Sequence, residues 1–366
     1  MRPIHRLLAG LVIAAVALPF YNRHADVENF ALESSSRAPL GKWNGVNFTA
    51  YLVKDIKAVI SRHQGKRSTP SQCEPLDILW LGNSQLHLVN QFRQGDQIAP
   101  YWMRGGLSCP EVSVPFGFSL ANANLQEQYV LATYAVSRLP VRLILLELCF
   151  DDMREDGLRT DFSDFLDPAD LKRLTGNPAG HEIMAAAQSA WHQRARADEN
   201  KQDVTTQALV EDWLNDALAD VWPLWRERAQ QRGQVMLDLY FMRNAALGIK
   251  PTTVRKMIAP RYARNMGALR QLLVDARRDG VKVIAYIAPL RQDVPMPYNP
   301  DQYQAWKNAI SMMAETYGAE LLNLETAVPP QFWGSNRGDD IDFMHFRGEG
   351  HRIMAKTLLP YVERAR

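Results

Sequence analysis

The chain of 366 residues lacks several features that would assign a protein to a class at once. It has only three cysteines, and no Cys/His spacing typical of a zinc site, no Gly-rich phosphate loop and no long repeat. The formal net charge is only +2, so there is no electrostatic case for binding nucleic acid or a strongly acidic partner. The sequence suggests neither a metal nor an organic cofactor.

A long apolar run is also missing. Residues 7–20 carry no charged or strongly polar side chain and follow the basic Arg2 and Arg6, but a run of 14 residues is shorter than the ~20 of a straightforward membrane span. We expect residues 1–22 to be a short retained membrane anchor, with the rest of the chain on the periplasmic side of the inner membrane. Cleavage as a signal peptide after Ala15-Val16-Ala17, followed by secretion, is the alternative.

Hydrophobic residues make up 46% of the chain, which is ample for one large core or for a core with an insertion. Apolar runs that favour buried strands alternate with helical patterns, and this order predicts an α/β fold with a parallel central sheet covered on both faces. The expected strands are 76–81, a short one near 111–114, 141–148, 281–288 and 319–324; the expected helices are 48–61, 85–92, 125–138, 262–279, 301–317 and 352–362.

The pattern suggests a core interrupted by a second unit. We expect a stalk and a lead-in helix over 23–70, a core over 71–160 and 261–366, and a helical insertion over 161–260 that contains Trp191, Trp213, Trp222 and Trp225. Ordinary helix packing explains the tryptophans. The alternative is that the insertion is a lid, or a docking face for a membrane partner or a glycan.

Ser84 follows the first expected strand, in the run Gly82-Asn83-Ser84. A serine between a buried strand and a helix start lies at the carboxyl end of the strand, where it is a natural nucleophile. A serine at this place can also serve only as a helix N-cap.

A second pattern lies near the other end of the chain. Asp342 precedes His345 by three residues on an expected loop, just before the last expected helix. Its carboxylate can therefore reach Nδ1 of the imidazole and leave Nε2 to take a proton from Ser84. The ordered set of Ser84, Asp342 and His345 is more specific than any member alone.

These two blocks carry a family resemblance. Gly82-Asn83-Ser84 resembles the Gly-Asp-Ser block of the SGNH (GDSL-type) hydrolases, with Asn in place of Asp, and Asp342 to His345 is similar to that family's closing Asp-x-x-His block. The resemblance covers roughly residues 75–155 and 262–362, and it implies a three-layer flavodoxin-like fold. By overall layout the chain also resembles membrane-anchored DltD-like and alginate-acetylation-like proteins, which accompany membrane-bound O-acyltransferases.

The resemblance further implies donors for an oxyanion hole beside the N–H of Ser84. Gly117, Asn122 and Asn124 are the candidates in the second block, although an Asn is equally a good helix N-cap. In the third block Asp151 takes the place of the family's Asn. An ionised carboxylate cannot donate a hydrogen bond, so Asp151 faces elsewhere, is protonated, or leaves the role to other donors.

Three further residues lie near these blocks, and two of them have two interpretations each. Arg291, at the exit of a strand, can contact a carboxylate, phosphate or glycan, or form a surface ion pair. His87 can face the site or be a satisfied buried histidine, and His351 is expected to serve the structure.

The cysteines precede or end strands. Cys73 and Cys109 each lie just before an expected strand, and neighbouring parallel strands would place both at the same end of the sheet, so we predict a disulfide between them in an exported protein. Cys149 is expected to be free and buried.

Two functional hypotheses follow. The first is an exported serine-dependent O-acyl transferase or esterase that acts on a cell-envelope or secreted polysaccharide, with an acetyl or other small acyl group and a membrane-bound O-acyltransferase as partner. The second is a non-catalytic accessory subunit that docks such a membrane enzyme or binds glycan. The set of Ser84, Asp342 and His345 favours the first hypothesis, and Asp151 favours the second.

Overall fold

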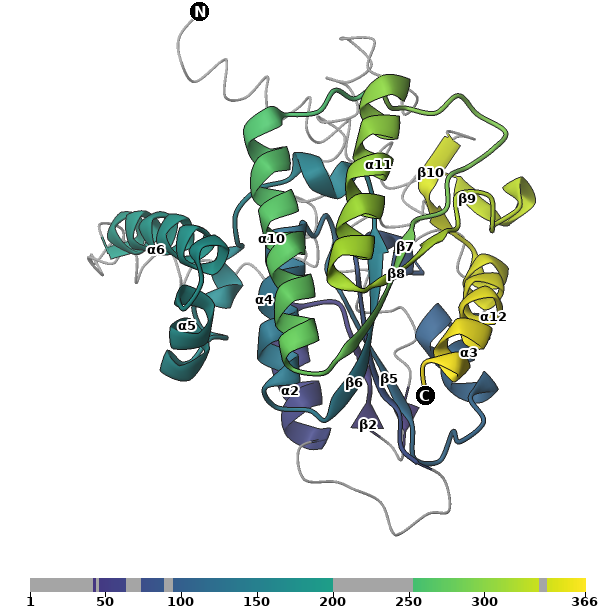
Figure 1. Ribbon diagram of the computed structural model, residues 1–366, viewed down its shortest axis with the longest axis horizontal. Coiled ribbons are helices and arrows are strands. Elements are labelled where there is room, and N and C mark those ends of the chain that lie inside the picture. The colour runs from purple at the N-terminus through teal and green to yellow at the C-terminus, as the bar shows by residue number, and fades with distance from the viewer. Residues whose placement is uncertain (1–41, 44–45, 64–73, 89–94, 200–252, 336–340) are drawn as a thin grey trace, which may run out of the picture.

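The computed structural model describes residues 42–43, 46–63, 74–88, 95–199, 253–335 and 341–366. Its centre is a parallel sheet of six strands in the order β3-β5-β4-β6-β7-β8 (Figure 1). In chain order these strands are β3 (Thr49–Ala50), β4 (Asp77–Gly82), β5 (Val114–Ser119), β6 (Val141–Leu148), β7 (Lys282–Ile287) and β8 (Glu320–Asn323).

The order of β4 to β8 is the flavodoxin-like order 2-1-3-4-5, with β3 added at the edge beside β5. Strand order therefore reverses around β4, because β5 lies on one side of it and β6 on the other. In open α/β sheets, such a switch point leaves a crevice at the carboxyl ends of the strands.

Helices cover both faces of the sheet, which gives three layers (Figure 1). One face carries α2 (Val53–His63), α4 (Leu125–Val136), α10 (Ala259–Arg278) and α11 (Pro300–Tyr317); the other carries α3 (Ala99–Gly106) and α12 (Gly348–Arg364). The core is accordingly divided in two. Leu79 and Leu81 pack on the α4 side and Ile78 and Trp80 on the α12 side, as the period of two along a strand requires.

The expected strands 76–81, 141–148, 281–288 and 319–324 and the expected helices 125–138, 262–279, 301–317 and 352–362 are confirmed, with shifts of a few residues at their ends. Side-chain caps explain two of the helix starts. Asn124 accepts from the N–H of Glu127 at the start of α4, and Asn299 accepts from the N–H of Gln302 at the start of α11.

Three expected boundaries were wrong. The second strand is Val114–Ser119 rather than 111–114, because pairing with β4 along its whole length overrides the turn character of Pro115 and Gly117. The helix expected from residue 48 begins at Val53, since Thr49–Ala50 pairs with β5 instead. Of the helix expected over 85–92, the described residues form only a 3₁₀ turn, η2 (Ser84–Leu86), and His87 is extended; residues 89–92 lie outside the described part of the chain.

A hairpin replaces the loop expected before the last helix. After η5 (Pro330–Phe332), strand β9 (Trp333–Ser335) pairs antiparallel with β10 (Ile341–Phe346). Asp342 and His345 are therefore on a strand rather than on a loop. Trp333 and Phe346 pack edge to face at a centroid distance of 5.4 Å, which anchors the hairpin to the core beside α12.

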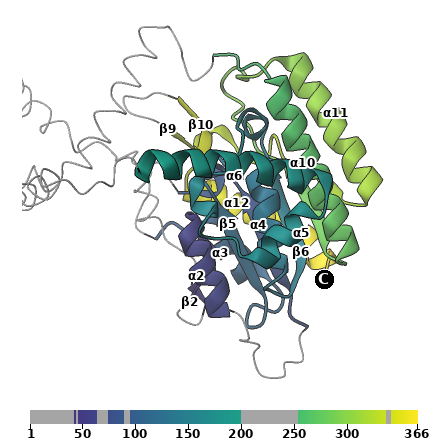
Figure 2. The same ribbon diagram turned by 90° about the vertical axis from the view of Figure 1, so that its left-hand side faces the viewer.

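The segment expected to be a helical insertion is helical as far as the structure describes it. It begins at η4 (Thr160–Phe162), which contacts α2, and continues with α5 (Pro168–Thr175) and α6 (Pro178–Glu199), which lie over α4 and α10 (Figure 2). Trp191 is half-buried against the main core, as ordinary helix packing predicts. Trp213, Trp222 and Trp225 lie outside the described residues, and the division into core and insertion stays a prediction.

A short antiparallel pair, β1 (Lys42–Trp43) and β2 (Val46–Asn47), precedes the sheet. Residues 1–22 lie outside the described part of the chain. Within the described residues, no helix has the length and apolar character needed to cross a membrane. Anchoring and export therefore stay predictions.

Candidate active site

Ser84 lies at the carboxyl end of β4, beside the point where the strand order reverses. Gly82 ends the strand, and Asn83 caps the 3₁₀ turn η2 by accepting a hydrogen bond from the N–H of Gln85 at 2.8 Å. The backbone N–H of Ser84 has no acceptor within the described residues. That N–H is therefore available to a bound ligand at this edge of the sheet.

The structure brings Ser84, His345 and Asp342 together, although 261 residues separate the first two along the chain. Nε2 of His345 lies 3.0 Å from Oγ of Ser84, and Nδ1 lies 2.9 Å from Oδ2 of Asp342. Strand β10 supplies both the imidazole and the carboxylate, and its hairpin with β9 carries them over the carboxyl end of β4.

Asp342 is fixed in an ionised state. Burial alone would raise its pKa, but attraction to the protonated form of His345 and hydrogen bonds from the His345 side chain and from the N–H groups of Met344 and His345 outweigh burial and lower the pKa. Its Oδ1 accepts from those two N–H groups at 2.8 and 3.1 Å. Because a carboxylate only accepts, Nδ1 of His345 carries a proton and Nε2 is left to accept from the Ser84 hydroxyl.

Two more histidines lie next to this set, and both are structural. His87 and His351 are fully buried, and burial lowers the pKa of each to about 3, so both are neutral. The ring of His87 donates to the carbonyl of Ser119, and the ring of His351 donates to the carbonyl of His87. The second contact links α12 to the segment after Ser84, and it explains why His87 leaves the helical conformation that the sequence predicts.

Gly117 and Asn124 do not supply oxyanion donors. The N–H of Gly117 donates to the carbonyl of Phe48 at 3.0 Å, because Gly117 lies inside β5 and not after it. Asn124 caps α4 through Oδ1, and its Nδ2 donates to the carbonyl of Gly157 at 2.8 Å. The N–H of Gly117, the Oδ1 of Asn124 and one hydrogen of its Nδ2 are thus already used by the protein.

Asn122 remains a candidate donor. It is the one described non-glycine residue with a positive φ, at 53°, and it follows β5, the strand beside β4. Such a left-handed conformation is unfavourable for most residues, although Asn tolerates it best. The turn is held from behind, because Arg159, which is paired with the buried Glu127, donates to the carbonyl of Ala121.

Asp151 faces away from an oxyanion role. Its carboxylate forms ion pairs with Arg255 and Arg154 and accepts from the hydroxyl of Tyr298 at 3.1 Å. The Arg255 guanidinium also lies 4.5 Å from the ring centre of Phe343, the residue after Asp342. No pattern in the sequence pointed to Arg255, because this residue falls in the segment expected to be an insertion. The ion pairs therefore compensate the negative charge that Asp151 brings to the position where the family has a donor.

Arg291 is committed to the protein and not to a ligand. Its Nε and Nη2 pair with Asp293, and its Nη1 donates to the carbonyls of Gly334 and Asp342 at 2.9 and 3.0 Å. Arg291 thus forms the expected ion pair. Its guanidinium also connects the loop after β7 to both strands of the hairpin that carries Asp342 and His345.

We expect Arg291→Ala to lower kcat by about tenfold and the free energy of unfolding by ~2 kcal/mol, because the two carbonyls lose a charged donor and the hairpin loosens. Kinetics on a small aryl acetate and urea unfolding measure the two effects. Arg277→Ala removes an exposed arginine of α10 and serves as the matched control. Unchanged kcat in Arg291→Ala would show that the hairpin keeps its place without this contact.

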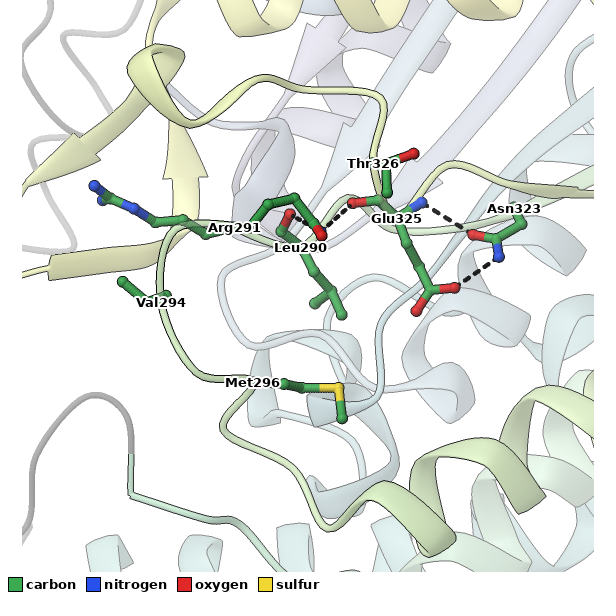
Figure 3. A pocket seen from close by; sticks show the side chains of 8 residues that line it. Leu290, Arg291, Val294, Met296, Asn323, Glu325 and Thr326 are labelled. Carbon is green, nitrogen blue, oxygen red and sulfur yellow. Dashed lines mark hydrogen bonds between the residues drawn. The ribbon is translucent and has the colours of Figure 1, made fainter.

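A polar cavity of about 370 Å³ adjoins these residues, between the loops that follow β7 and β8. Figure 3 shows Leu290 and Met296 between Arg291 on one side and Glu325 with Asn323 on the other. Two hydrogen bonds join the residues around the cavity to the candidate active site. Arg291 donates to the backbone carbonyl of Asp342, and Gln85, next to Ser84, donates to the carbonyl of Pro289 at 3.1 Å.

The cysteines divide as expected where the structure describes them. Cys109 is disulfide-bonded, and Cys149 is a free and buried thiol whose pKa burial raises well above its usual value. Cys73, the expected partner of Cys109, lies outside the described residues, so the pairing stays a prediction. In the described part of the chain, no cluster of three or more His, Cys, Asp or Glu side chains could hold a metal ion.

Comparisons with known proteins give only distant similarities. No family model and no curated protein matches the chain. Among solved structures, an acetylxylan esterase from Geobacillus stearothermophilus aligns at 10% identity and a TM-score of 0.39 over 78% of this chain and 94% of its own. A GDSL-like lipase from Bacteroides thetaiotaomicron aligns at 12% identity and a TM-score of 0.36 over 85% and 100%. Similarity at this level assigns neither a fold family nor an activity to the chain.

Proposed function

We propose that the protein is a serine-dependent O-acyl esterase or O-acyl transferase of the SGNH type. The observation that carries the proposal is the chain of hydrogen bonds from Ser84 Oγ through His345 to Asp342. It has the order of nucleophile, base and orienting carboxylate that acyl transfer through a serine requires. The arrangement of Asp342 and its backbone donors favours the tautomer of His345 that accepts a proton.

In this mechanism Nε2 of His345 takes the proton of Ser84 while Oγ attacks the carbonyl carbon of an ester. The tetrahedral intermediate collapses to an acyl-serine, and the departing alcohol takes the proton back from His345. Water or an acceptor hydroxyl then gives a proton to His345 and attacks the acyl-serine. As the acyl group leaves Oγ, His345 returns this proton to Oγ, which transfers the acyl group and restores Ser84. Asp342 keeps its negative charge throughout and stabilises the imidazolium.

The developing oxyanion needs donors that are not already occupied. The N–H of Ser84 meets that condition, and Asn122, in the turn after the strand next to β4, is our candidate for the second donor. Asp151 does not oppose the oxyanion as a bare charge would, because Arg255 and Arg154 pair with it. This compensation answers the main objection that the sequence raised against catalysis.

The cavity beside Arg291 suits a neutral, hydroxyl-rich group. Its charged side chains are compensated, Arg291 by Asp293 and Glu325 by Lys307 at 3.0 Å. Asn323 and Gln292 add amide groups. A sugar unit is therefore our proposal for the alcohol part of the ester or for the acceptor, in line with a cell-envelope or secreted polysaccharide as substrate. Export, membrane anchoring and a membrane-bound O-acyltransferase as partner belong to the same proposal.

Covalent labelling tests the proposal directly. We expect a fluorophosphonate probe to add one label per chain at Ser84, because only a serine with a positioned base reacts readily with such a probe. Mass spectrometry of the labelled peptide locates the site. If the folded protein takes up no label and cleaves no aryl acetate, the catalytic proposal fails and the accessory-subunit hypothesis takes its place.

A further inference from the structure

The residue before the nucleophile is held by two carboxyl groups, one near the end of β6 and one in the turn that follows this strand. The backbone N–H of Asn83 donates to Oε2 of Glu147 at 2.9 Å, and its side-chain Nδ2 donates to Oδ1 of Asp152 at 2.7 Å. Its remaining side-chain atom, Oδ1, accepts from the N–H of Gln85. Asn83 therefore uses its backbone and both ends of its side chain to connect three segments, and Ser84 is the next residue.

This arrangement is completely enclosed. Asn83, Glu147 and Asp152 are 1%, 0% and 2% exposed. Within the described residues neither carboxyl forms an ion pair, and Oε1 of Glu147 and Oδ2 of Asp152 have no hydrogen-bond partner. Burying a bare carboxylate is so costly that a carboxyl in such a place stays protonated.

Gly82 makes the contact with Glu147 possible. A Cβ at Gly82 would lie 2.3 Å from Oε2 of Glu147, which is closer than any real contact. Only glycine lets the carboxyl reach the N–H of Asn83. Residues 82–84 thus have separate roles. Gly82 leaves space for the carboxyl of Glu147, Asn83 is bound by the two carboxyl groups, and Ser84 faces the candidate active site.

We propose that Glu147 and Asp152 are positioning residues, which hold Asn83 from behind and thereby fix the N–H and Oγ of Ser84 relative to His345. The inference rests on the proposed function for its effect on activity, but the positioning itself is independent of catalysis. The neighbouring residue Asp151 points instead to Arg255. The two adjacent carboxyls therefore have different partners: Asp151 pairs with an arginine, and Asp152 accepts from Asn83.

The protonation states support this role. Burial raises the pKa of Glu147 to about 8, although the hydrogen bond from Asn83 opposes the shift, and burial raises the pKa of Asp152 well above its usual value. The titratable groups around the pair are Cys149, Asp151 and Tyr286; burial raises the pKa of Cys149 and of Tyr286 well above their usual values. As pH rises through about 8, Glu147 becomes a buried anion against the N–H of Asn83. This negative charge then lies close to the N–H of Ser84, which is the proposed donor to the oxyanion. Activity should therefore fall on the alkaline side.

The test compares Glu147→Gln, Glu147→Ala and Asp152→Asn with the wild-type protein. Gln and Asn keep the acceptor oxygen but cannot ionise, whereas Ala removes it. Glu315→Gln, an exposed glutamate on α11, is the matched control. The readouts are the rate of fluorophosphonate labelling from pH 6 to 9.5, and hydrogen exchange of the peptide that contains residues 82–88.

We expect Glu147→Ala to label at least tenfold more slowly and to exchange faster in that peptide. Glu147→Gln should label at the wild-type rate at pH 7 and keep its rate at pH 9, where the wild-type rate falls several-fold. Asp152→Asn should also keep the rate at pH 7. Normal exchange in Glu147→Ala, or an alkaline fall in Glu147→Gln equal to that of the wild type, would overturn the inference.

The two proposals fail in different ways. A wild-type protein that takes up no label removes the proposed function, but hydrogen exchange still reports whether Glu147 holds the segment. If Glu147→Ala does not fold, the labelling rates of Glu147→Gln and the wild type at pH 7 and 9 decide whether Glu147 positions the segment. If the protein takes up no label, the hydrogen-exchange rates of Glu147→Gln and the wild type at the same pH values decide this question. The Glu315→Gln control should match the wild type in every readout.

Discussion

Ser84→Ala is expected to fold like the wild type and to lose on the order of 10⁶-fold in kcat for cleavage of a small aryl acetate. Ser84 supplies the only oxygen that accepts the acyl group in the proposed mechanism, and alanine cannot replace it. The substitution removes one hydrogen bond, from Oγ to His345, so the free energy of unfolding should change by no more than about 1 kcal/mol. Stopped-flow or steady-state kinetics and urea unfolding measure the two quantities.

The control for this variant is Ser163→Ala, which removes an exposed serine hydroxyl after η4. It should keep full activity. Ser84→Ala should also fail to react with the fluorophosphonate while binding polysaccharide as the wild type does. Undiminished turnover in Ser84→Ala would exclude Ser84 as the nucleophile and leave the hydrogen-bonded set without a catalytic role.

Asp342→Asn is expected to lower kcat by about 10⁴-fold with little change in KM. Asn can keep its oxygen on the N–H groups of Met344 and His345, which Oδ1 of Asp342 contacts now. Its amide nitrogen then faces Nδ1 of His345, and an NH₂ group requires an acceptor there. The imidazole therefore takes the tautomer with the proton on Nε2, which cannot accept the proton of Ser84.

Stability should reveal the same carboxylate through its dependence on pH. Because the pKa of Asp342 is lowered in the folded protein, its ionisation stabilises the fold fully above the usual value of 3.8, and this stabilisation is lost as pH falls through the lowered pKa. The wild type should exceed Asp342→Asn in free energy of unfolding at pH 7, and the gap should shrink below about pH 4.

Urea unfolding at pH 7 and pH 3 tests this dependence, with Asp301→Asn, an exposed aspartate at the start of α11, as the control of equal charge. A gap between the wild type and Asp342→Asn that stays constant over this range would mean that Asp342 is not ionised in the way the hydrogen bonds require. Normal kcat in Asp342→Asn would remove Asp342 from the proposed mechanism.

Much of the fold follows from local sequence. Buried strands such as 141–148 are runs of Leu, Ile and Val, and helices such as 262–279 repeat apolar residues every three or four positions, so their positions needed no tertiary information. Where the prediction failed, tertiary contacts prevailed. Pro115 and Gly117 lie inside β5 because β4 pairs with them, and His87 is extended because two buried hydrogen bonds hold it.

The candidate site divides in the same way. The spacing of Asp342 and His345 and the place of Ser84 after an apolar strand were visible in the sequence, because each depends on neighbouring residues only. The distant partners of Arg291 and Asp151 were not visible, and neither was the contact of Asn124 Nδ2 with the carbonyl of Gly157. Arg291 reaches across 51 residues to the backbone of Asp342, and Asp151 pairs with Arg255 across 104.

The sequence by itself determined which residues could do chemistry and on which strands and helices most of them lie, since those properties come from side-chain type and short-range periodicity. Only the tertiary structure decided which of them meet. It set Oγ of Ser84 against His345, turned Asp151 toward Arg255, and enclosed Glu147 and Asp152 behind Asn83, where neither carboxyl forms an ion pair with a described residue. The physical reason is that contact, burial and charge compensation depend on distances between segments, which no local pattern in the chain contains.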